Sequence, residues 1–192
     1  MRARGAMDLT RPEMALTAPG AMDVLMVLTR AERPLSACEV ARRGDIAQEG
    51  VAEAALAVLM AQGIVLADGD QVGHALNREH VLTMALEQLA AARGRVVERL
   101  RMHIGTWDPA PVFAAVVGSV ARGAGGPEAD VDILLVRPAG LGADPRWAAQ
   151  REAVRADVRA WTGNAAHLIE MEDGAAVTLG GAAVILAGEL PA

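Results

Sequence analysis

The sequence predicts an α+β protein made of two parts that are each built from short elements. Residues 16–77 carry three helical patterns and then two short apolar runs around a turn, which predicts a helical unit ending in a hairpin. Residues 107–192 alternate apolar runs with one long helical pattern, which predicts a small mixed sheet. The chain has 192 residues, 53% of them hydrophobic, which is enough for two small cores.

The composition excludes several classes of function. All 18 basic residues are arginine, and with 24 acidic residues the net charge is -6, which excludes a globally basic nucleic-acid binder. Aromatic residues make up only 2% of the chain, too few for a base-stacking platform. Cys38 is the only cysteine, which excludes an internal disulfide and suits a reducing compartment. No apolar run reaches the ~20 residues that cross a bilayer. We therefore expect a cytoplasmic protein without membrane contact.

The helical part begins after residues 1–15, which have mixed charge and no period and are expected to form a tail. Apolar positions over 21–28 predict a first helix. Ser36 and Glu39 form a capping box, which predicts the start of a short second helix. A third helix is expected over 47–62.

A hairpin should follow the third helix. The runs 64–67 and 71–76 flank the turn dipeptide Asp68-Gly69. Three helices and a hairpin in this order resemble the winged helix-turn-helix domain of bacterial repressors, which we assign to residues 16–77. The resemblance implies possible DNA contacts from Arg42, Arg43 and Gln48.

The charge of this part opposes duplex DNA. Between residues 20 and 77 the sequence has four arginines and eight acidic residues, so the segment carries 4 − 8 = −4. DNA binding depends on neutralising phosphates with basic side chains. A protein–protein or dimerisation role is therefore the stronger interpretation, and DNA binding is kept as the alternative.

Residues 78–106 read as one connecting helix. Its apolar positions recur at spacings of three, four or seven, at Leu82, Leu86, Leu89, Val96, Leu100 and Ile104. Such a stripe either pairs with a second copy of the chain, giving a homodimer, or packs against a neighbouring domain. Prolines 109 and 111 then break the helix, which places the boundary of the second domain at residue 107.

Two acidic residues at the start of a strand are the most informative feature of the second part. An apolar run over 112–117 ends in Gly118-Ser119, and after ten intervening residues Asp130 and Asp132 open a second apolar run. Strand alternation places both carboxylates on one face, where they repel each other. A divalent cation removes that conflict, and Mg²⁺ commonly uses one or two carboxylates together with substrate phosphates.

The spacing of Gly118-Ser119 and Asp130-Val131-Asp132-Ile133 resembles the signature of the DNA polymerase beta nucleotidyltransferase superfamily, in its minimal branch. The resemblance implies two Mg²⁺ ions held by Asp130, Asp132 and a third acid from a later strand. It also implies that Gly118 and Ser119 bind the nucleotide phosphates, and that Arg122 neutralises part of their charge.

The third acid should lie on a strand over 165–172, after a helix over 144–161. Alternation places Glu170 and Glu172 on one face of that strand and His167 on the other. Glu170 is the first choice for the metal ligand and Glu172 the alternative. His167 has no ligand-type neighbour at a recognisable spacing and is interpreted as structural.

The resemblance implies a Mg²⁺-dependent transfer of an adenylyl group from ATP to a hydroxyl of a protein or small molecule. Relatives of the minimal branch act as antitoxins, which implies a toxin-like protein partner. The alternative is a winged-helix transcriptional regulator whose second domain is not catalytic. Residues 174–192 are short and rich in glycine and alanine, so they leave little material for a separate substrate-binding domain.

Overall fold

A computed structural model describes residues 16–67, 73–124, 129–175 and 179–189, and the predicted tail over 1–15 lies outside these ranges. It confirms a mixed α+β protein with two small sheets. The chain divides into two compact units, Met1–Ala91 and Ala92–Ala192. The division thus falls inside the predicted connecting helix and not at residue 107. No helix in the described ranges is both long and apolar enough to span a membrane.

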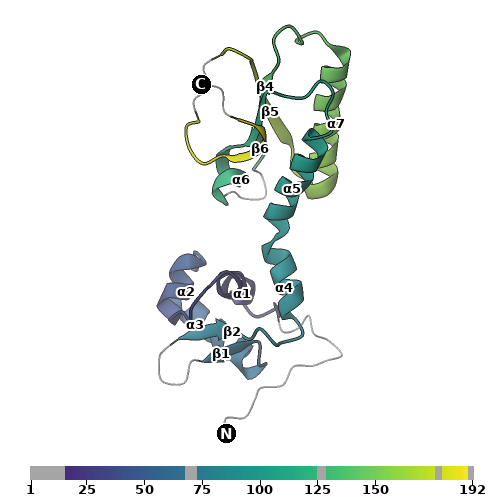
Figure 1. Cartoon of the computed structure of the whole chain (residues 1–192). Coiled ribbons are helices and arrows are strands. Elements are labelled where there is room, and N and C mark those ends of the chain that lie inside the picture. Colours follow the sequence, from purple (N-terminus) through teal and green to yellow (C-terminus); the bar gives the residue numbers. More distant parts are fainter. Residues whose placement is uncertain (1–15, 68–72, 125–128, 176–178, 190–192) are drawn as a thin grey trace. The chain divides into compact units, whose positions relative to one another are not determined.

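The first unit follows the predicted order of elements. Its helices are α1 (Ala21–Thr29), α2 (Ala37–Arg43) and α3 (Glu49–Ala61), gathered beside a small sheet (Figure 1). The Ser36 side chain accepts a hydrogen bond from the Glu39 backbone N–H, and the Glu39 carboxylate accepts one from the Ser36 N–H. This reciprocal cap satisfies two backbone donors that a helix start otherwise leaves unpaired.

The hairpin consists of β1 (Val65–Ala67) and β2 (His74–Leu76), paired antiparallel, and its tip at residues 68–72 lies outside the described ranges. Leu35 adds an isolated antiparallel bridge to His74, which ties the segment before α2 to the same sheet. The core between the helices and the hairpin is fully buried and aliphatic, including Leu25, Leu56 and Ile64.

The predicted single helix over 78–106 is wrong. The structure has α4 (Thr83–Ala90) and α5 (Ala92–Ile104), with a break at Ala91. Leu86 is buried in the core of the first unit, whereas Leu100 and Ile104 are buried in the core of the second. The apolar stripe is therefore divided between two separate cores and is not one continuous dimerisation seam. The prediction failed because the spacing of apolar residues does not tell which core each of them faces.

A four-stranded sheet forms the centre of the second unit, with strand order β5-β4-β3-β6. Its strands are β3 (Phe113–Val116), β4 (Val131–Arg137), β5 (Ala166–Glu172) and β6 (Val184–Gly188). β4 and β5 are parallel, and the other two neighbouring pairs are antiparallel. The crossover from β4 to β5 runs through α7 (Pro145–Thr162), which is capped by Asp144.

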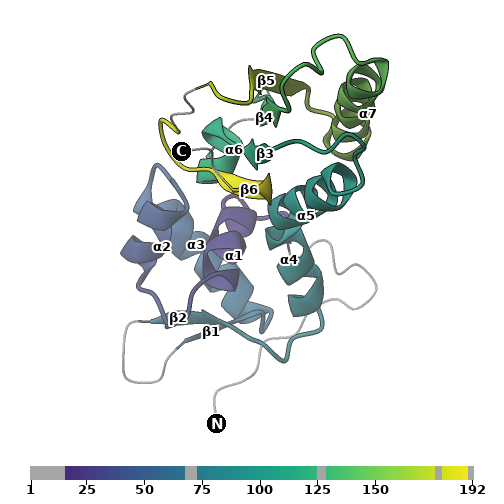
Figure 2. The same cartoon turned by 45° about the horizontal axis from the view of Figure 1, so that its top comes forward.

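The two faces of this sheet are covered differently. Helices α5 and α7 lie on one face (Figure 2), which we call the helix face, and a large core that includes Trp147 fills the space between them and the sheet. The other face, which we call the open face, carries a smaller apolar cluster around Phe113, Leu134 and Met171. Leu179 and Ala183 pack against that cluster.

Sequence reasoning missed β6. It lies in the segment that was interpreted only as glycine- and alanine-rich, yet it pairs antiparallel with β3 along one edge of the sheet. Gly188 shows why a glycine is needed there, because a Cβ at this position would lie 1.9 Å from the Val112 carbonyl oxygen. The run of branched residues at 184–186 was the available signal for a strand.

Candidate functional site

The turn after β3 brings a glycine against an acidic side chain. Val117 follows β3 and donates its backbone N–H to the Asp132 carbonyl at 2.9 Å, and the short helix α6 (Gly118–Arg122) begins at the next residue. Gly118 has a φ of +69°, and a Cβ on it would lie 2.2 Å from Oδ2 of Asp132. Only glycine fits both the backbone conformation and the space. The turn and the second acid of the sequence motif therefore lie in direct contact.

His167 holds the other side of the same carboxylate. β4 and β5 pair in a register that places the Cα atoms of Asp132 and His167 opposite each other. Nδ1 of His167 lies 3.1 Å from Oδ1 of Asp132. The Asp132 side chain is 28% exposed and that of His167 is 62% exposed, so solvent or a ligand can reach both. Asp132 is thus held between an imidazole and a glycine at the margin of the open face.

The remaining predicted residues of the motif lie near this contact in the chain. Asp130 directly precedes β4 and is exposed, and Ser119 is the second residue of α6 and half-buried. Arg122 is exposed at the end of α6.

A cavity of about 340 Å³ opens on the same sheet face, and we call it the Gly118 cavity. The side chains of Leu134 and Ile169, from the positions two residues after Asp132 and His167, form its floor. Gly118 and Arg122 contribute from α6, and residues 179–182 close another side. The lining is apolar apart from the Arg122 side chain and backbone groups. This cavity can accept an apolar group next to the Arg122 side chain.

Glu170 and Glu172 do not join Asp132. They alternate with His167, and the register of β4 and β5 places them on the helix face beside Leu135 and Arg137. Oε2 of Glu170 accepts hydrogen bonds from Arg151 at 2.6 Å and from the Trp147 indole at 3.2 Å. Its Oε1 lies 3.2 Å from Nε of Arg137. The expectation of a third carboxylate from this strand is therefore corrected, because both glutamates lie on the wrong face.

The electrostatics of Glu170 are those of a structural ion pair. Burial by itself raises the pKa of this carboxyl, but the hydrogen bonds from Arg151 and Trp147 outweigh burial, and the resulting pKa lies below the ordinary value. Glu172 interacts at the same end of the sheet, where it accepts the Gly140 N–H at 3.0 Å. The Glu170 carboxylate thus joins β5 to α7, and the Glu172 carboxylate joins β5 to the loop at Gly140.

The described side chains do not supply the ligand set that two metal ions need. Among the described residues, no group of three or more histidine, cysteine, aspartate or glutamate side chains is placed to hold a metal ion. Asp130 and Asp132 supply carboxylate oxygens, the donors that Mg²⁺ prefers, and an ion of this kind takes its other ligands from phosphate and water. The expected second ion lacks the third carboxylate on which it depended.

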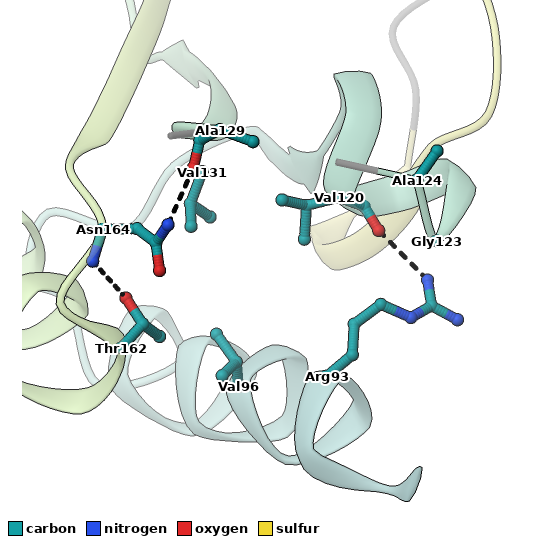
Figure 3. Close-up of a pocket in the computed structure, with 9 residues that line it drawn as sticks. All are labelled: Arg93, Val96, Val120, Gly123, Ala124, Ala129, Val131, Thr162 and Asn164. Carbon is teal, nitrogen blue, oxygen red and sulfur yellow. Dashed lines mark hydrogen bonds between the residues drawn. The ribbon is translucent and has the colours of Figure 1, made fainter. Parts of the chain in front are cut away.

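A second cavity, of about 250 Å³, lies between α5, the end of α6 and the end of α7 (Figure 3). Nη1 of Arg93 donates to the carbonyl oxygens of Val120 and Ala121, both at 3.1 Å. Across the cavity, the Asn164 side chain donates to the Ala129 carbonyl at 3.0 Å. These bonds fasten the two ends of the connection that leads from α6 to Asp130.

The three weaker candidates in the first unit are all on its surface. Arg42 and Arg43 are exposed in the last turn of α2, and Gln48 is exposed at the N-cap of α3. Glu49 follows in the first turn of α3. The charge of −4 over residues 20–77 as a whole remains unfavourable for phosphate.

His167 is the site residue that sequence reasoning missed. Its partner Asp132 lies 35 residues away, so no spacing within the strand could indicate the contact. The signal was available in the alternation pattern, which already set His167 apart from Glu170, together with the register of two parallel strands. No protein-family model matches the chain, and no curated protein or solved structure is significantly similar to it.

Proposed function

We propose that the second unit is a nucleotidyltransferase that binds a nucleoside triphosphate with Mg²⁺ and transfers the nucleoside monophosphate to an acceptor hydroxyl. The observation that carries the proposal is the contact between Gly118 and the Asp132 carboxylate. This contact leaves turn backbone without a side chain next to a partly exposed carboxylate. A site that brings a phosphate close to backbone and metal uses such an arrangement.

The arrangement around this contact supports a triphosphate ligand. Asp130 and Asp132 would hold the Mg²⁺, which supplies charge neutralisation and Lewis-acid polarisation of phosphate oxygens when bound. Ser119 would offer its hydroxyl to the β- and γ-phosphates, and Arg122 at the rim of the Gly118 cavity would offset part of their charge. The apolar floor of that cavity suits a nucleoside. ATP is the donor that the family resemblance implies.

The proposed reaction is an in-line displacement at the α-phosphate. The acceptor oxygen forms a bond to the α-phosphorus while the bond from that phosphorus to the bridging oxygen breaks. Pyrophosphate leaves with the electron pair, and the proton of the acceptor hydroxyl passes to solvent. Gly118 would let the α-phosphate approach the backbone closely, and Asp132 would hold the Mg²⁺ beside it. A toxin-like protein is the acceptor that the resemblance implies, and a small-molecule hydroxyl is the other option.

Transfer of label tests this function directly. The full chain is incubated with Mg²⁺, ATP labelled at the α-phosphate and candidate acceptor proteins, and acceptor-bound label is measured. We expect label on the acceptor with the wild type and none with the combined Asp130→Ala and Asp132→Ala variant. The Glu172→Gln variant, altered on the helix face, is the matched control and should retain transfer. Label that survives the double aspartate substitution contradicts the proposal.

A second candidate function is that of a winged-helix regulator whose nucleotidyltransferase-type unit binds nucleotide without transfer. Two observations favour it: the helix and hairpin order of the first unit, and the helix-face position of Glu170. Arg42, Arg43 and Gln48 would then contact DNA. Binding to the DNA upstream of its own gene, weakening steeply with salt, would support this candidate, and no binding at low ionic strength would count against it.

A further inference from the structure

Strand β5 places an imidazole beside Asp132, at the position where a two-ion site requires a carboxylate. His167 is the β5 residue whose Cα pairs with that of Asp132, and its Nδ1 lies 3.1 Å from Oδ1 of Asp132. The two glutamates of β5 lie on the helix face, and Glu170 is fully engaged by Arg137, Arg151 and Trp147. No rotation of a side chain can bring a carboxylate from β5 to the open face, because alternation fixes the face of each residue.

The charge available at this margin decides how many cations it can hold. Two divalent ions about 4 Å apart repel each other strongly, and bridging carboxylates offset that repulsion in two-ion sites. Here Asp130, directly before β4, and Asp132 on β4 carry one negative charge each, and β5 offers a histidine in place of a carboxylate. Two negative charges match one divalent cation. The phosphates of a bound nucleotide bring further negative charge, but they act as ligands of the first ion.

We propose that this site holds one divalent cation per bound nucleoside triphosphate, and that a second is not bound because position 167 carries a histidine where that ion needs a carboxylate. The inference rests on the proposed function for the binding of the nucleotide. What it adds is the number of metal ions bound with each nucleotide. It assigns to His167 a role in determining metal stoichiometry, through the place it occupies beside Asp132. Replacing the imidazole by a carboxylate should then create the missing position.

Counting bound Mn²⁺ tests the inference without any turnover. The full chain is saturated with α,β-methylene-ATP, an analogue that resists cleavage at the reacting bond, and is titrated with Mn²⁺ while the free ion is followed by electron paramagnetic resonance. We expect one Mn²⁺ per chain–nucleotide complex in the wild type and two in His167→Asp. His167→Asn, which removes the imidazole without adding charge, should remain at one ion. His167→Glu is the second carboxylate variant if His167→Asp does not fold.

Each outcome bears on a different claim. Two ions in the wild type overturn the inference and leave nucleotide binding standing. One ion in folded His167→Asp or His167→Glu, as judged by an unchanged circular dichroism spectrum, overturns the role of His167. Failure of the wild type to bind Mn²⁺ and the nucleotide at all overturns the proposed function, and the inference falls with it. One ion in the wild type and two in the carboxylate variant support both.

Discussion

The two faces of the four-stranded sheet use the same two strands for different purposes. On the helix face, Glu170 of β5 is enclosed by two arginines and an indole. Trp147 and Arg151 join α7 to the sheet through this carboxylate, and Arg137 joins β4 to β5 through it. On the open face, Asp132 of β4 touches a glycine and an exposed histidine, with a cavity beside them. Glu170, which is paired with two arginines, has a structural role. Asp132, which is partly exposed beside a glycine turn, can bind a ligand.

Substituting Asp132 should produce the largest change in function and a small change in stability. We expect Asp132→Asn to reduce label transfer at least about a hundredfold, because a metal ligand contributes several kcal/mol to transition-state stabilisation. The free energy of unfolding should change little, since the side chain is partly exposed and is hydrogen-bonded to the exposed His167 side chain. Initial transfer rates and urea unfolding of the same preparation measure the two effects. A folded variant with wild-type rates would place the chemistry elsewhere.

Gly118→Ala should damage both function and stability. The alanine Cβ would overlap Oδ2 of Asp132, and a positive φ costs a non-glycine residue roughly 1–2 kcal/mol. We expect nucleotide affinity to fall about tenfold or more, an effect of about 1.4 kcal/mol. Gly140→Ala is the matched control, because Gly140 also has a positive φ but a Cβ there meets nothing within 4 Å. Calorimetric titration should separate the two variants, and equal affinities would show that the contact with Asp132 is unimportant.

Glu170→Gln should show the opposite behaviour. Loss of the charged hydrogen bonds is expected to lower the free energy of unfolding by about 1–3 kcal/mol, because Arg137 and Arg151 keep their charges on a partly buried surface. Transfer by the folded variant should stay near the wild-type rate. Glu172→Gln, at a half-exposed position on the same face, is the control and should change stability by less than about 0.5 kcal/mol. Loss of transfer in folded Glu170→Gln would mean that the two faces are coupled.

Acid should lower the free energy of unfolding by a smaller amount, by protonating Glu170 on the helix face. The pKa of Glu170 is lowered in the folded state, so the folded protein takes up this proton less readily than the unfolded chain. The resulting stabilisation is present above the ordinary carboxyl pKa of 4.5 and is lost as the pH falls below it. The difference in unfolding free energy between wild type and Glu170→Gln should therefore shrink from pH 7 toward pH 3. A difference that stays constant with pH would show that the charge of Glu170 does not matter.

Local patterns were sufficient to predict most elements, and they failed where the answer depends on long-range pairing. The capping box at Ser36, the turn at Gly118 and the acidic start of β4 were all readable from neighbouring residues. The break at Ala91 was not, because Leu86 and Leu100 have the same helical spacing yet belong to different cores.

The same distinction separates the correct and the wrong predictions for the candidate site. Gly118 and Asp132 were predicted to lie together, and the structure brings them into contact. The choice of Glu170 required knowing which face of β5 meets Asp132, and that depends on the register of two strands separated by a helix of 18 residues. A shift of one residue exchanges His167 for a glutamate-bearing face, so alternation alone left the decision open.

The most direct test of the central claim is to see which face of the sheet responds to Mg²⁺ and nucleotide. Side-chain resonances of Ile169 and Met171 report on the open face, and the indole N–H of Trp147 reports on the helix face. On addition of Mg²⁺ and α,β-methylene-ATP, the account predicts large shifts at Ile169 and Met171 and a nearly unchanged Trp147 signal. Shifts confined to Trp147, or none at any of the three, would contradict it.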